Sequence, residues 1–113
     1  MRKNTQAVLS AFVNRKALNK AQSIWCTQDA IYSYGTCIAF RVSEDLVIVN
    51  VTVYSRTTTR HQRSILEWLA RDIIKVNGLD RNVNETALVR KAREAGYLQQ
   101  APGPAFGVPL QPA

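Results

Sequence analysis

The chain has 113 residues, which is enough for one hydrophobic core and too few for two. Its apolar share of 46% is that of a folded domain, and no apolar run reaches the roughly 18–20 residues of a membrane span. The start of the sequence is basic but lacks the apolar stretch of a secretory signal, so we expect a cytoplasmic protein without a membrane partner.

The net charge of +7 is unevenly distributed along the chain. Residues 1–26 carry five cations and no acid, and residues 55–81 carry six cations against three acids. A positive field of this kind favours a polyanion or an acidic protein surface as the partner. Its simplest alternative role is to keep a small protein in solution.

The first predicted element is a helix that begins at Asn4 or Thr5, either of which can act as its N-cap. It ends between residues 14 and 19, and its apolar residues repeat at helical spacing: Val8, Leu9, Phe12 and Val13.

Four strands are predicted next, over residues 23–26, 30–34, 37–42 and 46–54. Short polar or glycine-containing segments separate them, which indicates hairpins rather than crossovers. One face of the last two strands is apolar throughout, and the other becomes polar. The pattern therefore predicts an antiparallel meander of three or four strands with one covered face. An uncovered edge strand of such a sheet could pair in a homodimer.

Two cysteines, Cys26 and Cys37, fall in these predicted strands and are too few for a disulfide framework. Neighbouring strands would permit a bridge between them, but a reducing cytoplasm disfavours one. We expect two buried free thiols.

A second, long helix is predicted over residues 58–76, ended by Asn77 and Gly78. Its apolar side holds Ile65, Leu69, Ile73 and Val76, and its opposite side holds Arg60, Arg63, Arg71 and Lys75. A short third helix runs from a cap at Asn84 to Ala95, with Gly96 in the terminating position.

The predicted fold is thus α+β, an antiparallel meander packed against one long helix, with an N-terminal helix and a short C-terminal helix. Residues 1–100 form a single domain, and residues 101–113 are a tail rich in proline and glycine that we expect to be disordered.

The segment at 54–63 carries the main functional prediction, because three threonines and three arginines gather where the last strand gives way to the long helix. Thr59 and Gln62 have the spacing of a capping box, with Thr58 as an alternative cap. A helix start attracts anions, and hydroxyl and guanidinium donors suit phosphate. The alternative interpretation is ordinary caps and solvated charges. The candidate anion-binding residues are Arg56, Thr57, Thr58, Thr59, Arg60, His61, Gln62, Arg63, Arg71 and Lys75.

His61 is the only histidine, and it sits two turns before Trp68, on whose ring it could stack. A structural role is more expected than a catalytic one, because no partner stands at useful spacing. One histidine, two distant cysteines and scattered carboxylates do not supply four metal ligands, so neither a metal nor a cofactor is expected.

Three aromatic residues on the predicted strands, Trp25, Tyr32 and Tyr34, could hold single-stranded nucleic acid if they were exposed beside cations. Packing is the favoured interpretation, since Tyr32 and Tyr34 share a face that a helix could cover.

A two-part pattern covers residues 23–69. Its first part is Y-S-Y-G-T-x-I-A from Tyr32 to Ala39, and its second is N-x-T-x-Y-S-x-T-T-x-x-H-Q from Asn50 to Gln62. This pattern resembles a family of small uncharacterised proteins encoded by tailed bacteriophages. The resemblance implies expression in the cytoplasm of an infected bacterium and supplies no mechanism. It points to Thr57, Thr58, His61 and Gln62.

Three functions remain open from the sequence. The first is a non-enzymatic module that binds the phosphate backbone of nucleic acid with weak sequence preference. The second is an accessory protein that binds and modulates an acidic host or phage protein. The third and least expected is an enzyme acting on a phosphorylated small molecule through His61 and a neighbouring threonine or arginine.

Overall fold

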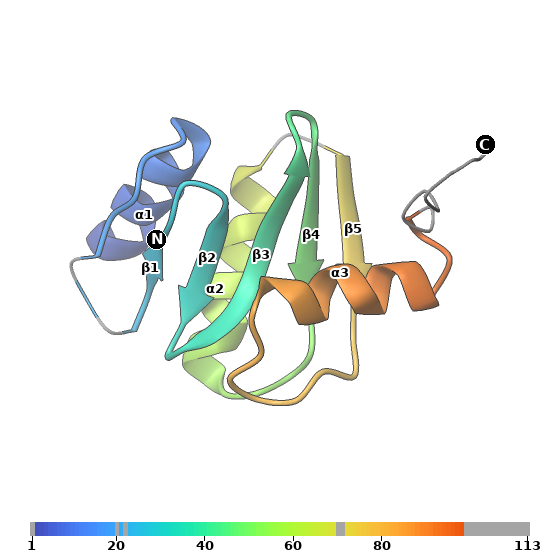
Figure 1. Ribbon diagram of the computed structural model, residues 1–113. Helices are drawn as coiled ribbons and strands as arrows, with labels where there is room; N and C mark the ends of the chain where they lie inside the picture. The colour runs from blue at the N-terminus through green and yellow to red at the C-terminus, as the bar shows by residue number, and fades with distance from the viewer. Residues whose placement is uncertain (1, 20, 22, 70–71, 99–113) are drawn as a thin grey trace.

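The computed structural model describes residues 2–19, 21, 23–69 and 72–98, so the predicted tail at 101–113 lies outside the described residues. Helices and strands follow one another in a mixed order (Figure 1). Their bounds are α1 Lys3–Val13, β1 Trp25–Cys26, β2 Ala30–Ser33, β3 Thr36–Ser43, β4 Leu46–Asn50, α2 Arg56–Trp68, β5 Asp72–Val76 and α3 Glu85–Glu94.

One five-stranded sheet has its strands in chain order, β1-β2-β3-β4-β5. The pairs from β1 to β4 are all antiparallel, which confirms the predicted meander. The prediction of a purely antiparallel sheet is wrong, because β5 lies parallel to β4, with Leu46 opposite Asp72 and Asn50 opposite Val76. A parallel pair needs a crossover connection, and α2 is that connection.

The prediction of one long helix over 58–76 is also wrong. The helix α2 ends at Trp68, and residues 72–76 form β5, after which Asn77 and Gly78 follow a strand rather than end a helix. The β-branched residues of β5 favour extended backbone, and the apolar strand β4 would otherwise expose an unpaired edge. The helical spacing of Ile65, Leu69, Ile73 and Val76 is therefore coincidental across the boundary.

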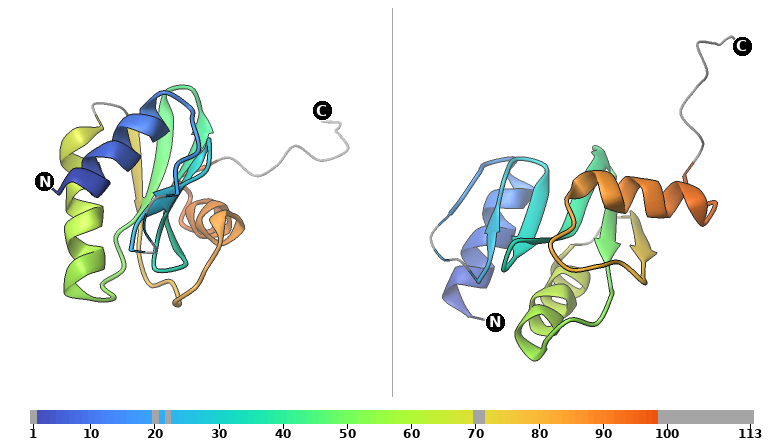
Figure 2. Two further views of the ribbon diagram at one scale, coloured as in Figure 1. Left: turned by 90° about the vertical axis from the view of Figure 1, so that its left-hand side faces the viewer. Right: turned by 60° about the horizontal axis from the view of Figure 1, so that its bottom comes forward.

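Helices cover both faces of the sheet, so the predicted single covered face is wrong as well. Figure 2 shows α1 and α2 on one side and α3 on the other. Two buried apolar clusters fill the two interfaces. Phe12 and Ile65 belong to the cluster under α1 and α2, and Leu88 and Ala92 belong to the cluster under α3. The apolar residues of β4 on both sides explain why both faces are covered.

The helix α1 starts earlier than predicted. Its N-cap is Arg2, which makes no side-chain capping bond, and Asn4 and Thr5 lie inside the first turn. Thr5 is buried instead of capping. Two cations, Arg2 and Lys3, therefore stand at the start of α1.

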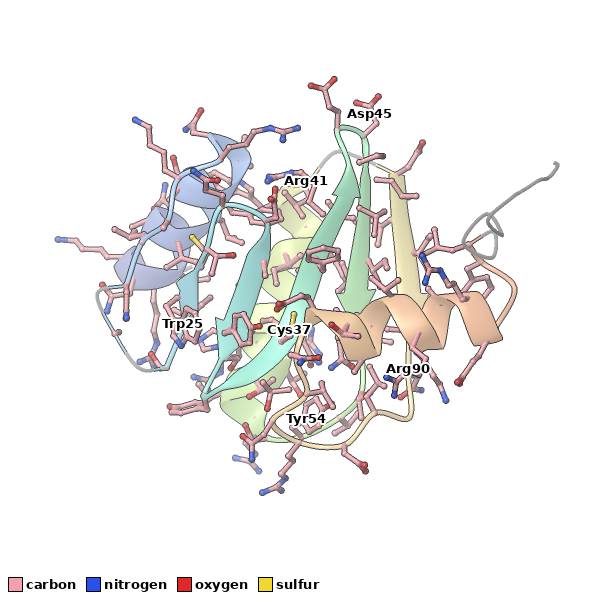
Figure 3. All side chains as sticks on the ribbon, viewed as in Figure 1. Trp25, Cys37, Arg41, Asp45, Tyr54 and Arg90 are labelled. Carbon is pink, nitrogen blue, oxygen red and sulfur yellow. The ribbon has the colours of Figure 1, made fainter. Side chains whose placement is uncertain are left out.

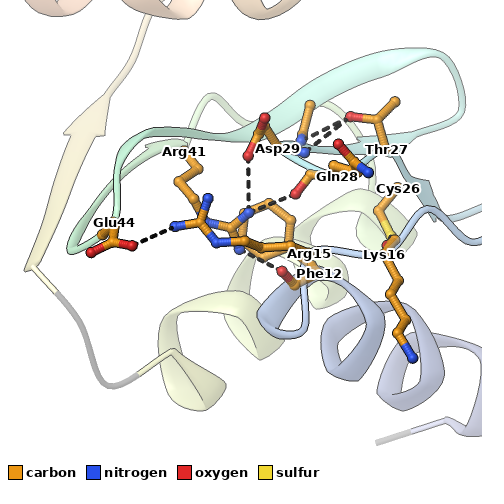
Figure 4. A network of polar contacts seen from close by, with 10 residues as sticks. Phe12, Arg15, Lys16, Cys26, Thr27, Gln28, Asp29, Arg41 and Glu44 are labelled. Carbon is orange, nitrogen blue, oxygen red and sulfur yellow. Dashed lines mark hydrogen bonds and ion pairs between the residues drawn. The ribbon is translucent and has the colours of Figure 1, made fainter.

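A buried arginine holds the other end of α1 against the sheet (Figure 4). The guanidinium of Arg41, on β3, lies 4.1 Å from the centre of the Phe12 ring and donates to the Phe12 carbonyl. It also donates to the carbonyl of Gln28 at 2.6 Å and to the Asp29 carboxylate at 3.1 Å. Such stacking and charge-assisted bonds suit arginine far better than lysine.

Two further predictions are confirmed. The helix α3 begins after an N-cap at Asn84, whose side chain accepts from the amide of Ala87, and Gly96 follows with a φ of 80°. Cys26 and Cys37 are both buried free thiols. Burial raises the pKa of each, in the case of Cys37 to about 12, so both stay protonated near neutrality.

Candidate anion-binding site

Ser55 caps α2, which corrects the prediction of a cap at Thr58 or Thr59. The Ser55 hydroxyl oxygen accepts from the Thr58 amide at 3.2 Å, and its carbonyl accepts from the Thr59 amide at 2.9 Å. The amides of Thr58 and Thr59 are thus already bonded within the helix start. These two amides are therefore not available to an anion that approaches the helix start.

A chain of hydroxyl groups leads from the exposed helix cap to the buried His61. The Ser55 hydroxyl donates to Thr58 Oγ1 at 3.2 Å, and Thr58 Oγ1 lies 3.0 Å from Ser33 Oγ. Ser33 Oγ in turn lies 2.8 Å from Nδ1 of His61. If each hydroxyl donates once along this direction, Nδ1 accepts the last bond and Nε2 carries the ring hydrogen.

The partner of His61 is therefore Ser33, 28 residues away on β2, which spacing along the chain does not reveal, and a buried bond of this kind agrees with the structural role expected for the histidine. Within the described part of the chain, His61 makes no ring contact with Trp68. Ser33 is only 1% exposed, and its hydroxyl is also bonded to Thr58 Oγ1, so the hydroxyl is already engaged within the fold. The pair therefore orients the histidine ring and does not form an accessible nucleophile.

Gln62 is a structural residue rather than a ligand. Its amide nitrogen donates to the carbonyls of Asn50 at 2.6 Å and Thr52 at 2.9 Å. Asn50 is fully buried and donates to the carbonyl of Cys37 at 3.1 Å and to the Tyr54 hydroxyl at 3.0 Å. These bonds fix the loop between β4 and α2, where Tyr54 lies (Figure 3).

A cavity of about 690 Å³ opens beside this network, between the start of α1, the turn after β2 and the outer side of α2. Four cations line it against one acid, Glu67. Its lining residues are Arg2, Lys3, Asn4, Thr5, Ser23, Ile24, Tyr34, Thr57, Arg60, His61, Arg63, Ser64 and Glu67. We call it the basic cavity.

His61 is a titratable group that lines the basic cavity. Burial and then the positive charge of Arg2 lower its pKa below the usual value, so the ring is neutral at pH 7. Because Ser33 engages Nδ1, Nε2 is the ring nitrogen that remains for a ligand. The cavity thus combines guanidinium and ammonium groups with a neutral imidazole, a set that suits an oxyanion.

Tyr34 separates the basic cavity from a second hollow of about 480 Å³. Tyr34 and Thr57 line both, so the two hollows adjoin there. The second hollow lies between the turn after β2, the loop before α2 and the loop before α3. It contains a single cation, Arg81, among the residues Ser33, Tyr34, Thr36, Tyr54, Ser55, Thr57, Thr58, Arg81 and Asn82.

The predicted site residues are only partly brought together. Thr57, Arg60, His61 and Arg63 line the basic cavity, whereas Thr58 and Gln62 are buried in the network. Arg56 is exposed and Thr59 half-buried at the helix start, outside the cavity lining. Lys75 lies on β5 and not on α2, which breaks the predicted basic stripe, and Arg71 lies outside the described residues.

The predicted anion-binding residues do not include Arg2, Lys3 and Tyr34, which line the basic cavity. The five cations of residues 1–26 were a signal for the first two, but only the fold brings the start of α1 to α2. Tyr34 does not lie on a strand beside Tyr32 as predicted, because it occupies the turn between β2 and β3.

The fold and this site define a small α+β domain with a mixed sheet and a basic cavity on one helical layer. Residues 6–77 match a family described as being of unknown function, DUF8033, and the chain belongs to that family. The match extends from α1 to β5 and ends before α3. Neither a curated protein nor a solved structure matches the chain.

Two other features are absent from the described residues. These residues contain no group of three or more histidine, cysteine, aspartate or glutamate residues that could hold a metal ion. They also contain no helix that is both long and apolar enough to cross a membrane.

Proposed function

We propose that this protein is a small basic accessory module that binds nucleic acid through the phosphate backbone and performs no catalysis. The single observation that carries the proposal is the basic cavity, where Arg60 and Arg63 of α2 meet Arg2 and Lys3 of α1. Segments far apart in the sequence thus contribute like charges to one place. Like charges repel one another, so gathering them costs stability unless an anion lies between them.

The donors of the cavity suit the oxygens of a phosphate group. Guanidinium groups bind phosphate oxygens through paired N–H donors, and the neutral imidazole of His61 lies at the cavity wall. An inserted helix or ribbon that could read base edges is not part of this site, so sequence preference should be weak. The bacteriophage origin, the cytoplasmic location and a homodimer remain predictions beside this function.

The first experiment is a salt titration of binding to a short fluorescein-labelled oligonucleotide, followed by fluorescence anisotropy. If three to five phosphates are neutralised, the affinity should fall log-linearly and by more than about tenfold between about 50 and 200 mM salt. An affinity that does not change with salt, or no binding at low salt, would reject nucleic acid and leave an acidic protein as the partner.

Charge-reversal variants locate the contact. Arg60→Glu combined with Arg63→Glu lowers the net charge from +7 to +3 at the cavity. Lys16→Glu combined with Arg90→Glu makes the same change at exposed positions outside it, where Arg90 lies on α3 (Figure 3). Only the first pair should abolish measurable binding at about 200 mM salt. Equal losses in both pairs would show a diffuse field and no site.

A further inference from the structure

We propose that Tyr34 is a stacking platform for an unpaired base, so that the preferred ligand is single-stranded nucleic acid. This inference rests on the proposed function and names the substrate class of the same site. It is carried by three independent features of Tyr34: its backbone conformation, its exposure, and its place between the two hollows.

The backbone of Tyr34 is unusual for a residue with a large side chain. Ser33 pairs with Thr36 across a two-residue hairpin loop, and Tyr34 and Gly35 have φ values of 49° and 81°. Both central residues of this turn are left-handed, a combination that normally selects Asn-Gly. A tyrosine in the first of these positions is energetically unfavourable compared with asparagine or glycine.

Packing does not offset this strain, since Tyr34 is 54% exposed. The turn itself is held firmly: the Asn82 amide donates to Thr36 Oγ1 at 2.9 Å, and the Cys37 amide donates to the Val83 carbonyl at 2.8 Å. A rigid turn that presents an aromatic ring to solvent is a preorganised surface for a flat ligand.

The position of the ring explains why that ligand would be a nucleobase. Tyr34 borders the basic cavity with its four cations on one side and the hollow with Arg81 on the other. A strand that crosses the ring can therefore place successive phosphates beside cations while one base lies on the tyrosine. In a duplex both faces of a base are already stacked, so only an unpaired base can use this surface.

The other large aromatic side chains are placed differently. Trp25 and Tyr32 stack on each other, with ring centres 4.3 Å apart and planes 4° apart, so each already has a partner. Tyr32 also donates to the carboxylate of Glu85, which ties it to α3. Trp68 and Tyr97 are exposed but line neither hollow. Tyr54 lines the second hollow but is half-buried and donates to backbone carbonyls, so among the described residues Tyr34 is the exposed aromatic ring that lines both hollows.

The test compares wild-type protein with Tyr34→Asn and Tyr34→Phe. Asparagine tolerates the left-handed turn and removes the ring, whereas phenylalanine keeps the ring. The probes are a labelled oligothymidine, an abasic strand of the same length, and a duplex. The abasic strand carries the same phosphates without bases, so it isolates the stacking contribution.

We expect wild-type protein and Tyr34→Phe to bind oligothymidine at least about fivefold more tightly than the abasic strand, which is the lower end for one stacked base. Tyr34→Asn should lose that preference and bind both single strands with the same salt-dependent affinity. Thermal unfolding serves as the folding control, and Tyr34→Asn should unfold no earlier than wild type.

The outcomes separate the two proposals. If Tyr34→Asn keeps the full preference for oligothymidine over the abasic strand, stacking on Tyr34 is wrong while backbone binding stands. If wild-type protein binds the duplex as tightly as oligothymidine, the single-strand preference is wrong. If no probe binds at low salt, the proposed function fails, and this inference fails with it.

Discussion

The two sides of α2 both carry polar residues, but these residues have different roles. The inner side carries Thr58, His61 and Gln62, which are buried, with most of their hydrogen-bonding capacity used within the fold. The outer side carries Arg60 and Arg63, which are exposed and line the basic cavity. Polar residues that resemble ligands in the sequence thus include many that hold the domain together.

His61 is the one residue that belongs to both sides. Its Nδ1 ends the hydroxyl chain, while the residue lines the cavity. Substitutions on the inner side of α2 should therefore alter the stability of the fold, whereas substitutions on the outer side should alter the binding of the ligand.

Asn50, the residue to which Gln62 is tied, should give the strongest effect on stability. Asn50→Ala leaves the Cys37 carbonyl and the Thr52 amide without their buried partners, so we expect a loss of about 3 kcal/mol in the free energy of unfolding. Urea unfolding at 25 °C measures it. Arg63→Ala on the outer side should stay within about 0.5 kcal/mol of wild type. Similar losses of unfolding free energy in Asn50→Ala and Arg63→Ala would contradict the different roles of the two sides.

The adjacent residues Thr57 and Thr58 allow a matched comparison, in which a smaller change in the free energy of unfolding is expected. Thr58→Val keeps the side-chain shape but removes the bonds to Ser33 and Ser55, and should cost about 1–2 kcal/mol. Thr57→Val, at a half-buried position on the cavity wall, should change the free energy of unfolding by less than about 0.5 kcal/mol. The reverse order would mean that Thr57, and not Thr58, is the structural threonine.

The pH dependence of stability should show the smallest effect. Because the pKa of His61 is lowered on folding, the unfolded chain binds this proton more readily than the folded protein. The contribution of neutral His61 to the stability of the fold is fully present above the pKa of about 6.5 in the unfolded chain. It is lost as the pH falls through the lower pKa of the folded protein. Urea midpoints at several pH values for wild type and His61→Asn measure it. Parallel pH profiles in the two proteins would show that His61 does not contribute.

Local patterns explain what could be predicted from the sequence. Alternation and short turns identify β1 to β4, and a capping asparagine followed by Gly96 identifies α3. The strand β5 was mistaken for helix because its partner is β4, which lies more than 20 residues earlier, and no glycine or proline marks the end of α2. The pairing of non-neighbouring segments is a tertiary effect that propensity does not encode.

The sequence predicts the region of the candidate site but not which residues line it. The cluster of threonine and arginine at 54–63 indicates where α2 begins, but spacing along the chain does not reveal which residues face inward. The contact between Ser33 and His61 joins the two parts of the Y-S-Y-G-T and T-T-x-x-H-Q pattern across 28 residues. That contact explains why Thr58, His61 and Gln62 are mostly structural, and why Tyr34 and Thr57 are the pattern residues left for a ligand.

The clamp of Arg41 on Phe12 has a practical consequence for handling the protein. It fixes the far end of α1, so the first turn of that helix is held with Arg2 and Lys3 at the mouth of the cavity. A purification tag or fluorescent fusion joined ahead of α1 would emerge beside this opening and obstruct it. A label attached beyond α3, on the opposite side of the sheet, would leave the opening clear (Figure 2).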